Sequence, residues 1–191
     1  MALRYSAPAF VDVDNDGDMD LVMGNYEYDL KFYYENTGNA THANYIRRED
    51  ALNPFDGVAS VGTVVQPAFV DVDDDEDMDL LIGRWEGDFI YYENTGSPTN
   101  PSYTRIEIAG YTFDGVADVG KFSVPAFVDT DNDEDMDLVI GREAGDLVYY
   151  ENTGNASNPS YTRRQGKLNP FDAVDVTGIS APAFVDVDND G

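Results

Sequence analysis

Residues 8–24 read Pro-Ala-Phe-Val-Asp-Val-Asp-Asn-Asp-Gly-Asp-Met-Asp-Leu-Val-Met-Gly, and close copies of this stretch recur along the chain. Its first five residues begin again at Pro67, Pro125 and Pro182, at spacings of 59, 58 and 57 residues. Self-similarity at a nearly fixed period is the signature of a repeat architecture. The sequence therefore predicts three complete repeats and the start of a fourth, with boundaries at residues 1–66, 67–124, 125–181 and 182–191.

Short apolar runs inside each repeat predict β-strands. In the first repeat they are residues 7–13, 21–26, 30–35 and 44–48, which are rich in Val, Phe and Tyr and are separated by Gly, Asn and Asp. No segment shows a sustained apolar period of 3.6 residues, so we expect little helix. Each repeat thus predicts about four strands.

The second predicted strand of each repeat is apolar at successive positions, as in Leu80-Leu81-Ile82. Successive side chains of a strand point to opposite faces of the sheet, so both faces must be covered. Four strands per repeat with both faces covered describe the blade of a β-propeller. We therefore expect an all-β, β-propeller-type array of four-stranded blades. Closed propellers have roughly four to eight blades, so further blades would come from a longer parent chain, which we favour, or from self-association.

The 191-residue chain has a formal net charge of −27, and more than half of its 38 Asp and Glu fall in four short runs. This charge favours cations and argues against nucleic acid, whose phosphates it would repel. The absence of cysteine excludes disulfides and thiolate metal sites. No apolar run approaches the roughly 18 residues that suggest membrane insertion. The acidic runs are residues 12–20, 71–79, 129–137 and 186–190.

The first acidic run has the pattern D-x-D-x-D-G-x-x-D. Carboxylates this close repel one another unless a cation lies among them. Ca²⁺ takes about six to eight oxygens, and an acidic loop can supply side chains from positions 1, 3 and 5 and the backbone carbonyl of position 7, with the Asp at position 9 completing the shell. Mg²⁺ fits less well, because it keeps its waters and demands a stricter octahedron. The competing interpretation is an acidic, solvated hairpin that binds nothing.

An EF-hand would need a Glu at position 12 and flanking helices, whereas Met23 occupies that position inside a predicted strand. The sequence instead predicts Ca²⁺ loops between strands. The candidate ligands are the Asp residues at positions 1, 3, 5, 7 and 9 of three loops: Asp12, Asp14, Asp16, Asp18, Asp20, Asp71, Asp73, Asp75, Asp77, Asp79, Asp129, Asp131, Asp133, Asp135 and Asp137.

The sixth position distinguishes the loops from one another. Gly17 permits a sharp turn, whereas Glu76 and Glu134 stand at the same position of the second and third loops. If that position needs a positive φ, a residue other than Gly costs on the order of 1 kcal/mol there. We expect the second and third loops to bind Ca²⁺ more weakly than the first. The fourth run lacks position 9 and should be incomplete; it contains Asp186, Asp188 and Asp190.

The acidic loop and the Tyr-Tyr-Glu-Asn-Thr-Gly stretch about ten residues later together resemble the VCBS/FG-GAP repeat. The resemblance extends over essentially the whole chain. It implies an integrin-like propeller with Ca²⁺ in the loop between the first two strands of each blade, where Asp18 would contribute its carbonyl. It also implies part of an extracellular or cell-surface protein, used in adhesion or beside a catalytic domain.

We favour a Ca²⁺-binding scaffold for adhesion or interaction, with a protein or glycan partner. One alternative is a glycan-binding, lectin-like propeller, which predicts pocket aromatics that recur in register, yet Trp85 does not recur. Another is the non-catalytic part of a secreted enzyme. We expect no enzymatic activity, because the single histidine, His42, lies in a turn that the other repeats lack, and no nucleophile motif is present.

Overall fold

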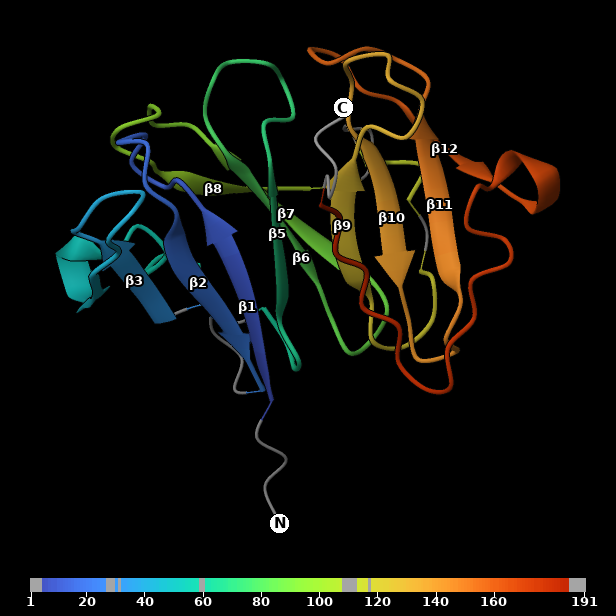
Figure 1. The fold of residues 1–191 in the computed structure, drawn as a ribbon, viewed down its shortest axis with the longest axis horizontal. Coiled ribbons are helices and arrows are strands. Elements are labelled where there is room, and N and C mark those ends of the chain that lie inside the picture. Colours follow the sequence, from blue (N-terminus) through green and yellow to red (C-terminus); the bar gives the residue numbers. More distant parts are fainter. Residues whose placement is uncertain are drawn as a thin grey trace.

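The computed structural model describes residues 5–26, 30, 32–58, 61–107, 113–116 and 118–185. Over these residues the protein is all-β, with three four-stranded antiparallel sheets (Figure 1). The only helices in this part of the chain are two 3₁₀ turns, η1 (Asp50–Leu52) and η2 (Gly166–Leu168). No helix among the described residues is long and apolar enough to cross a membrane. The all-β class expected from the sequence is confirmed.

The strands of each sheet are hydrogen-bonded in chain order. The first sheet contains β1 (Ser6–Val11), β2 (Asp20–Asn25), β3 (Phe32–Asn36) and β4 (Tyr45–Arg48). The second contains β5 (Gln66–Val70), β6 (Asp79–Gly83), β7 (Phe89–Asn94) and β8 (Tyr103–Ile106). The third contains β9 (Val124–Val128), β10 (Asp137–Gly141), β11 (Leu147–Asn152) and β12 (Tyr161–Arg164).

The predicted strands of the first repeat match these elements closely. The third strand begins at Phe32 rather than at residue 30, and the first strand, which was expected to reach Val13, stops at Val11. The reason is local: the carboxylate of Asp12 accepts hydrogen bonds from backbone N–H groups four and five residues later, which folds the chain into a loop. The β-ladder therefore ends where the acidic run begins.

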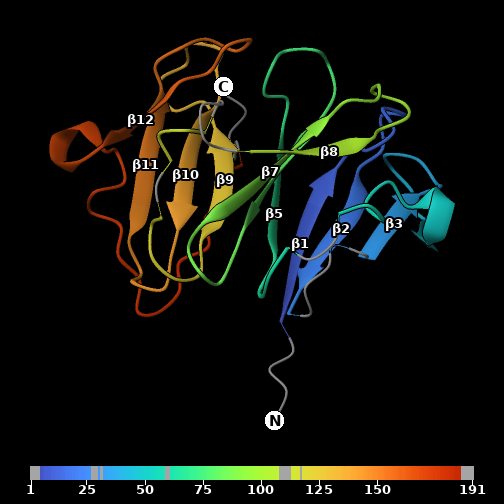
Figure 2. The ribbon, with the colours of Figure 1, turned by 180° about the vertical axis from the view of Figure 1, so that it is seen from behind.

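The three sheets stand side by side, and their first strands are adjacent, with β1 next to β5 and β5 next to β9 (Figures 1 and 2). One hydrophobic core lies between the first and second sheets, and another between the second and third. The middle sheet contributes to both cores, because Leu80 and Ile82 of β6 lie in the first core and Leu81 lies in the second. Its apolar second strand is covered on both faces, as the sequence predicts for a propeller blade.

One phenylalanine from the end of each of the first two repeats joins neighbouring sheets. The ring of Phe55 stacks on Tyr103 with a centroid distance of 4.8 Å and meets Phe69 at 5.8 Å, both from the second sheet. Its edge meets Tyr33 of its own sheet at 5.7 Å. Phe113 makes the same three kinds of contact in the second core, with Tyr91, Phe127 and Tyr161. Each core is therefore centred on an aromatic residue donated by the preceding repeat.

Close backbone contact accompanies this aromatic packing. Gly24 ends the core-facing part of β2, and a Cβ built on it would lie 2.0 Å from the carbonyl oxygen of Val65 and 2.9 Å from Cδ of Pro67. Gly83 approaches Ser123 and Pro125 in the same way. Only glycine allows this approach, so the glycine that ends each apolar run helps to set the spacing between the sheets.

Candidate metal centres

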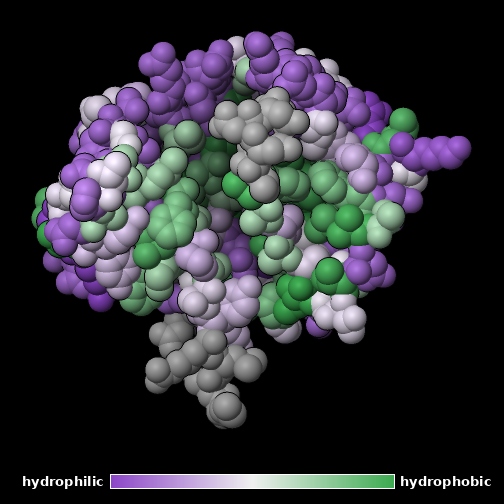
Figure 3. All heavy atoms as spheres, in the orientation of Figure 1, coloured by the Kyte–Doolittle hydropathy of each residue, from purple (hydrophilic) through white to green (hydrophobic). Residues whose placement is uncertain are grey.

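The three acidic loops connect the first two strands of each sheet, and all lie at the same end of the molecule (Figure 1). Hydrophilic side chains form the upper rim of the molecule in Figure 3, where these loops lie. Hydrophobic side chains gather in the middle of the same view. The loops comprise residues 12–19, 71–78 and 129–136.

Within each loop, the carboxylates at positions 1, 3 and 5 converge. One oxygen from each of Asp12, Asp14 and Asp16 lies within 4.8 Å of the other two. Two oxygens on opposite sides of one Ca²⁺ ion would be about 4.8 Å apart, because each Ca²⁺–O distance is about 2.3–2.6 Å. The spacing therefore suits a single hard cation. The equivalent groups in the other loops are Asp71, Asp73 and Asp75, and Asp129, Asp131 and Asp133.

The backbone of the loop holds the carboxylates at positions 1 and 5. The N–H groups of Asp16 and Gly17 donate to the Asp12 carboxylate at 3.1 and 2.8 Å, and the N–H of Asp18 donates to Asp16 at 2.9 Å. The second and third loops contain equivalent hydrogen bonds, centred on Asp71 and Asp129. Each loop is thus folded by its own side chains.

The sixth position of each loop has a positive φ, the conformation on which the expected cost of a Glu there depends. Gly17 has a φ of +90°, and Glu76 and Glu134 each have a φ of +71°. The fourth position is also left-handed, with φ between +55° and +62° at Asn15, Asp74 and Asn132. Asn and Asp tolerate this region better than most residues, which explains their place there.

The position 9 aspartates lie beneath the loops and are buried, each with only 1% of its surface exposed. Asp79 accepts hydrogen bonds from the Tyr91 hydroxyl at 2.8 Å and from the N–H groups of Asn94 and Val72 at 2.7 and 3.3 Å. Burial raises the pKa of Asp79 to about 7, although these hydrogen bonds oppose the shift. Asp20 has the same kinds of partner, contributed by Tyr33, Asn36 and Val13.

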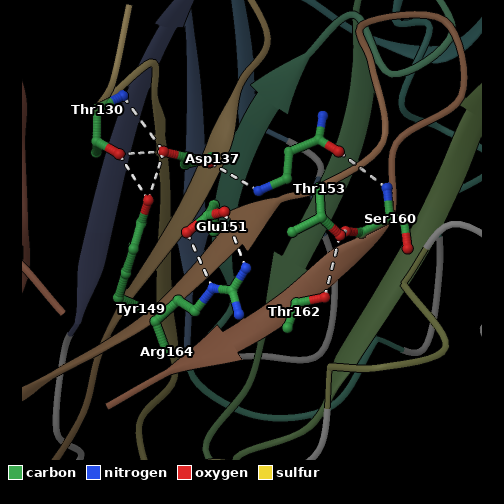
Figure 4. Close-up of polar contacts among 9 residues, drawn as sticks. Thr130, Asp137, Tyr149, Glu151, Thr153, Ser160, Thr162 and Arg164 are labelled. Carbon is green, nitrogen blue, oxygen red and sulfur yellow. Dashed lines mark hydrogen bonds and ion pairs between the residues drawn. The ribbon is translucent and has the colours of Figure 1, made fainter. Parts of the chain in front are cut away.

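In the third repeat, Thr130 occupies the position of Val13 and adds a hydroxyl that donates to Asp137 (Figure 4). The Tyr149 hydroxyl donates to the same carboxylate at 2.8 Å. A carboxylate has about four acceptor sites, so these aspartates can make few further contacts. Position 9 therefore anchors the loop to the third strand of its sheet, a role that the sequence analysis missed. The Tyr and Asn that recur in register in every repeat carried the signal for it.

The position 7 aspartates are also buried, with 9%, 4% and 6% of the surface exposed at Asp18, Asp77 and Asp135. One Oδ atom of Asp77 and one of Asp135 is buried and finds no hydrogen-bond partner in the part of the chain that the structure describes. Burial, followed by repulsion from neighbouring carboxylates, raises the pKa of each to about 6. From the sequence, only a backbone carbonyl was expected at this position.

Asp14, at position 3 of the first loop, also has a buried oxygen without a described partner and a raised pKa. Its Oδ1 is buried without a hydrogen-bond partner among the described residues, and its pKa is raised to about 6 by burial and then by Asp16 and Asp20. A buried oxygen without a partner is energetically costly, and such atoms call for an explanation such as a bound ion. One such atom is found in each acidic loop.

Glu35 of β3 and Glu151 of β11 are already paired with arginines. The Arg164 guanidinium donates two hydrogen bonds of 2.9 Å to Glu151 (Figure 4), and Arg48 donates two of 2.8 Å to Glu35. These bonds lower the pKa of both glutamates. Bidentate arginine binding occupies these carboxylates beside the loops.

The single tryptophan, Trp85, is half-buried and packs against other side chains of the same chain. The Trp85 ring lies edge-on to Phe122, with a centroid distance of 4.1 Å, and Lys121 lies 5.6 Å from the ring centroid. His42 is exposed, and its Nδ1 lies 3.0 Å from the hydroxyl of Thr41. None of these contacts involves a residue of the acidic loops.

No curated protein matches the chain. Residues 5–43 contain β1, the first acidic loop, β2 and β3, which are the parts that define the candidate centre. This segment matches the family model of the FG-GAP repeat, so the first repeat of the chain carries the signature of that family.

Proposed function

We propose that the protein is a Ca²⁺-binding, propeller-type repeat module that serves as an extracellular scaffold for adhesion or interaction. The repeats would be those delimited in the sequence, at residues 1–66, 67–124, 125–181 and 182–191. The match of residues 5–43 to the FG-GAP repeat supports the module, and the acidic loops support the cation.

The observation that carries the metal proposal is a buried carboxylate oxygen in each loop that has no hydrogen-bond partner among the described residues and lies beside three converging carboxylates. Asp14, Asp77 and Asp135 each bury an oxygen that a cation could contact. All donors are hard oxygen atoms, the ligands that Ca²⁺ prefers. The carboxylates at positions 1, 3 and 5 would hold the ion, position 7 would add an oxygen, and the Asp at position 9, which also supports the loop from below, would complete the shell.

The three loops should bind with different affinities. The first has Gly at position 6, whereas the second and third hold Glu76 and Glu134 in a left-handed conformation that disfavours them. We propose that the first loop binds most tightly. The fourth run, with Asp186, Asp188 and Asp190, lies outside the described residues, and the expectation that its site is incomplete remains a prediction.

The proposed role is structural rather than catalytic. Each acidic cluster recurs in register in three sheets, whereas a catalytic pair would be expected to break that symmetry. Ca²⁺ sites of extracellular modules bind at about 10⁻⁴–10⁻³ M, and partly exposed loops such as these suit that range.

Calorimetric titration with CaCl₂ tests the proposal, with MgCl₂ as the competing ion. Asp14→Asn should abolish the strongest binding step, and Asp77→Asn should weaken a later one. Asp56→Asn is the matched control, because it removes the same charge from an exposed turn outside the loops. Loss of heat in Asp14→Asn but not in Asp56→Asn supports a specific site. Equal effects from all three variants, or no saturable heat from the wild type, would reject it.

A further inference from the structure

The first sheet exposes the face that the other two sheets bury. Phe69 and Tyr103 of the second sheet, and Phe127 and Tyr161 of the third, pack around a phenylalanine from the preceding repeat. Their counterparts in the first sheet are Phe10 and Tyr45, which are 60% and 40% exposed. These two rings lie 6.4 Å apart and meet each other instead.

The other side chains on that face of the first sheet are also more exposed than their counterparts in the second sheet. Leu80, Ile82, Ile90 and Tyr92 of the second sheet are at most 4% exposed, because they lie in the first core. Their counterparts in the first sheet are all only half-buried: Leu21, Met23, Phe32 and Tyr34. The outer face of the first sheet is therefore a complete copy of a buried interface whose partner is missing from the described chain.

On the outer face of the third sheet, Phe171 and Val174 lack contacts with described residues that their counterparts in the first two repeats make. Phe171 is the counterpart of Phe55, and it meets Tyr149 at 5.8 Å and Phe184 at 5.7 Å, but no described tyrosine stacks on it as Tyr103 stacks on Phe55. Val174 is 41% exposed, whereas its counterparts Val58 and Val116 are 0% and 9% exposed.

Residues 181–185 fill part of this third face. Pro182 approaches Gly141 as Pro67 approaches Gly24, so the segment takes the place of a following first strand. Its distal part is exposed, with Val185 at 80% and Phe184 at 38%. Its sequence, Pro-Ala-Phe-Val from Pro182, is identical to that of residues 8–11 in β1.

We propose that the chain associates head to tail, so that Phe171 of one copy seats between Phe10 and Tyr45 of a second copy. The β1 strand of the second copy takes the place of residues 181–185 on the third sheet. The contact reproduces the interface that occurs twice inside each chain, which is why a second copy is the occupant that fits. Such an interface is heterologous: it joins two different faces and can close into a ring or extend.

Sedimentation velocity and light scattering on the full chain test this, over about 1–200 µM and at about 0.3 M NaCl to screen the acidic charge. The wild type should associate with increasing concentration. Phe10→Ser/Tyr45→Ser on one face and Val174→Asp on the other should each weaken association roughly tenfold or more. Leu52→Ser is the matched control, because Leu52 is 67% exposed but lies on η1, outside both faces.

Mixing the two defective variants provides the decisive measurement. Each keeps one intact face, so an equimolar mixture should form a two-chain complex with wild-type affinity, although each variant alone associates only weakly. Phe184→Ser should strengthen wild-type association by loosening the competing segment. Circular dichroism establishes that every variant is folded. A wild type that stays monomeric throughout, association that survives Val174→Asp, a mixture that stays monomeric, or weaker association of Phe184→Ser would overturn the proposal.

Discussion

The sixth position of each acidic loop requires a backbone conformation that glycine adopts freely. Gly17 has a φ of +90°, and a Cβ built on it would meet no atom within 4 Å. Gly17→Ala therefore changes the backbone preference without creating a steric clash. An L-residue in the left-handed region costs about 1–2 kcal/mol, so we expect this substitution to lower the free energy of unfolding by about that amount.

In a chain of this length, 1 kcal/mol corresponds to roughly 2–4 °C in Tm, so the expected decrease is roughly 2–8 °C. Thermal unfolding should be followed by circular dichroism in excess chelator, which removes any contribution from ion binding. Gly57→Ala is the matched control, because Gly57 is exposed, lacks a positive φ and also has open space around its Cβ position.

The opposite substitution at the equivalent position of the second loop should act in the opposite direction. Glu76 has a φ of +71°, so Glu76→Gly removes the left-handed penalty. The gain should be at most about 1 kcal/mol, because glycine also gains entropy in the unfolded chain.

If Gly17→Ala lowered Tm no more than Gly57→Ala, the left-handed conformation would not contribute to stability and the reasoning would be refuted.

Three further predictions concern the ion, the pH and the sheet spacing. Chelator should lower Tm relative to millimolar Ca²⁺, since a ligand at a hundredfold excess over Kd stabilises the native state by about 2.7 kcal/mol; identical melting curves would contradict the metal proposal. In chelator, urea midpoints should rise as the pH falls from 8 to 5, because burial raises the native pKa of Asp79 to about 7 and that of Asp77 to about 6, so the stabilisation is present at low pH and lost as pH rises through these values. With saturating Ca²⁺ the trend should reverse, because protonation competes with the ion. Gly83→Ala should cost about 1–3 kcal/mol in urea unfolding, since its Cβ would lie 2.2 Å from the Ser123 carbonyl oxygen, whereas Gly57→Ala should not.

The sequence was sufficient to predict the sheets and the loops between their strands. The period of the Pro-Ala-Phe-Val-Asp motif gave the number of sheets, and the double-sided apolar run at Leu80-Leu81-Ile82 predicted the two cores that β6 joins. The sequence raised a positive φ at the sixth position only as a condition, and the structure shows it at Gly17, Glu76 and Glu134.

The roles of positions 7 and 9 could not be predicted from local spacing. Asp79 is buried because Tyr91 and Asn94, more than ten residues later in the chain, pack over it from β7. One Oδ atom of Asp77 is also buried. Spacing alone shows which carboxylates are close in sequence, but burial depends on which distant strand lies beneath them.

The serial order of the sheets has a consequence for local unfolding. The outer sheets each share one hydrophobic core with the middle sheet, whereas the middle sheet shares two, and repeat proteins built in this way are stabilised by nearest-neighbour interfaces. An outer sheet can therefore open while one core stays intact, but exposing the backbone of β6 requires both to be lost. Native-state hydrogen exchange should be slowest in β6, in the middle sheet, and faster in β2 and β10, in the outer sheets. The protein would then open from its two outer sheets toward its centre.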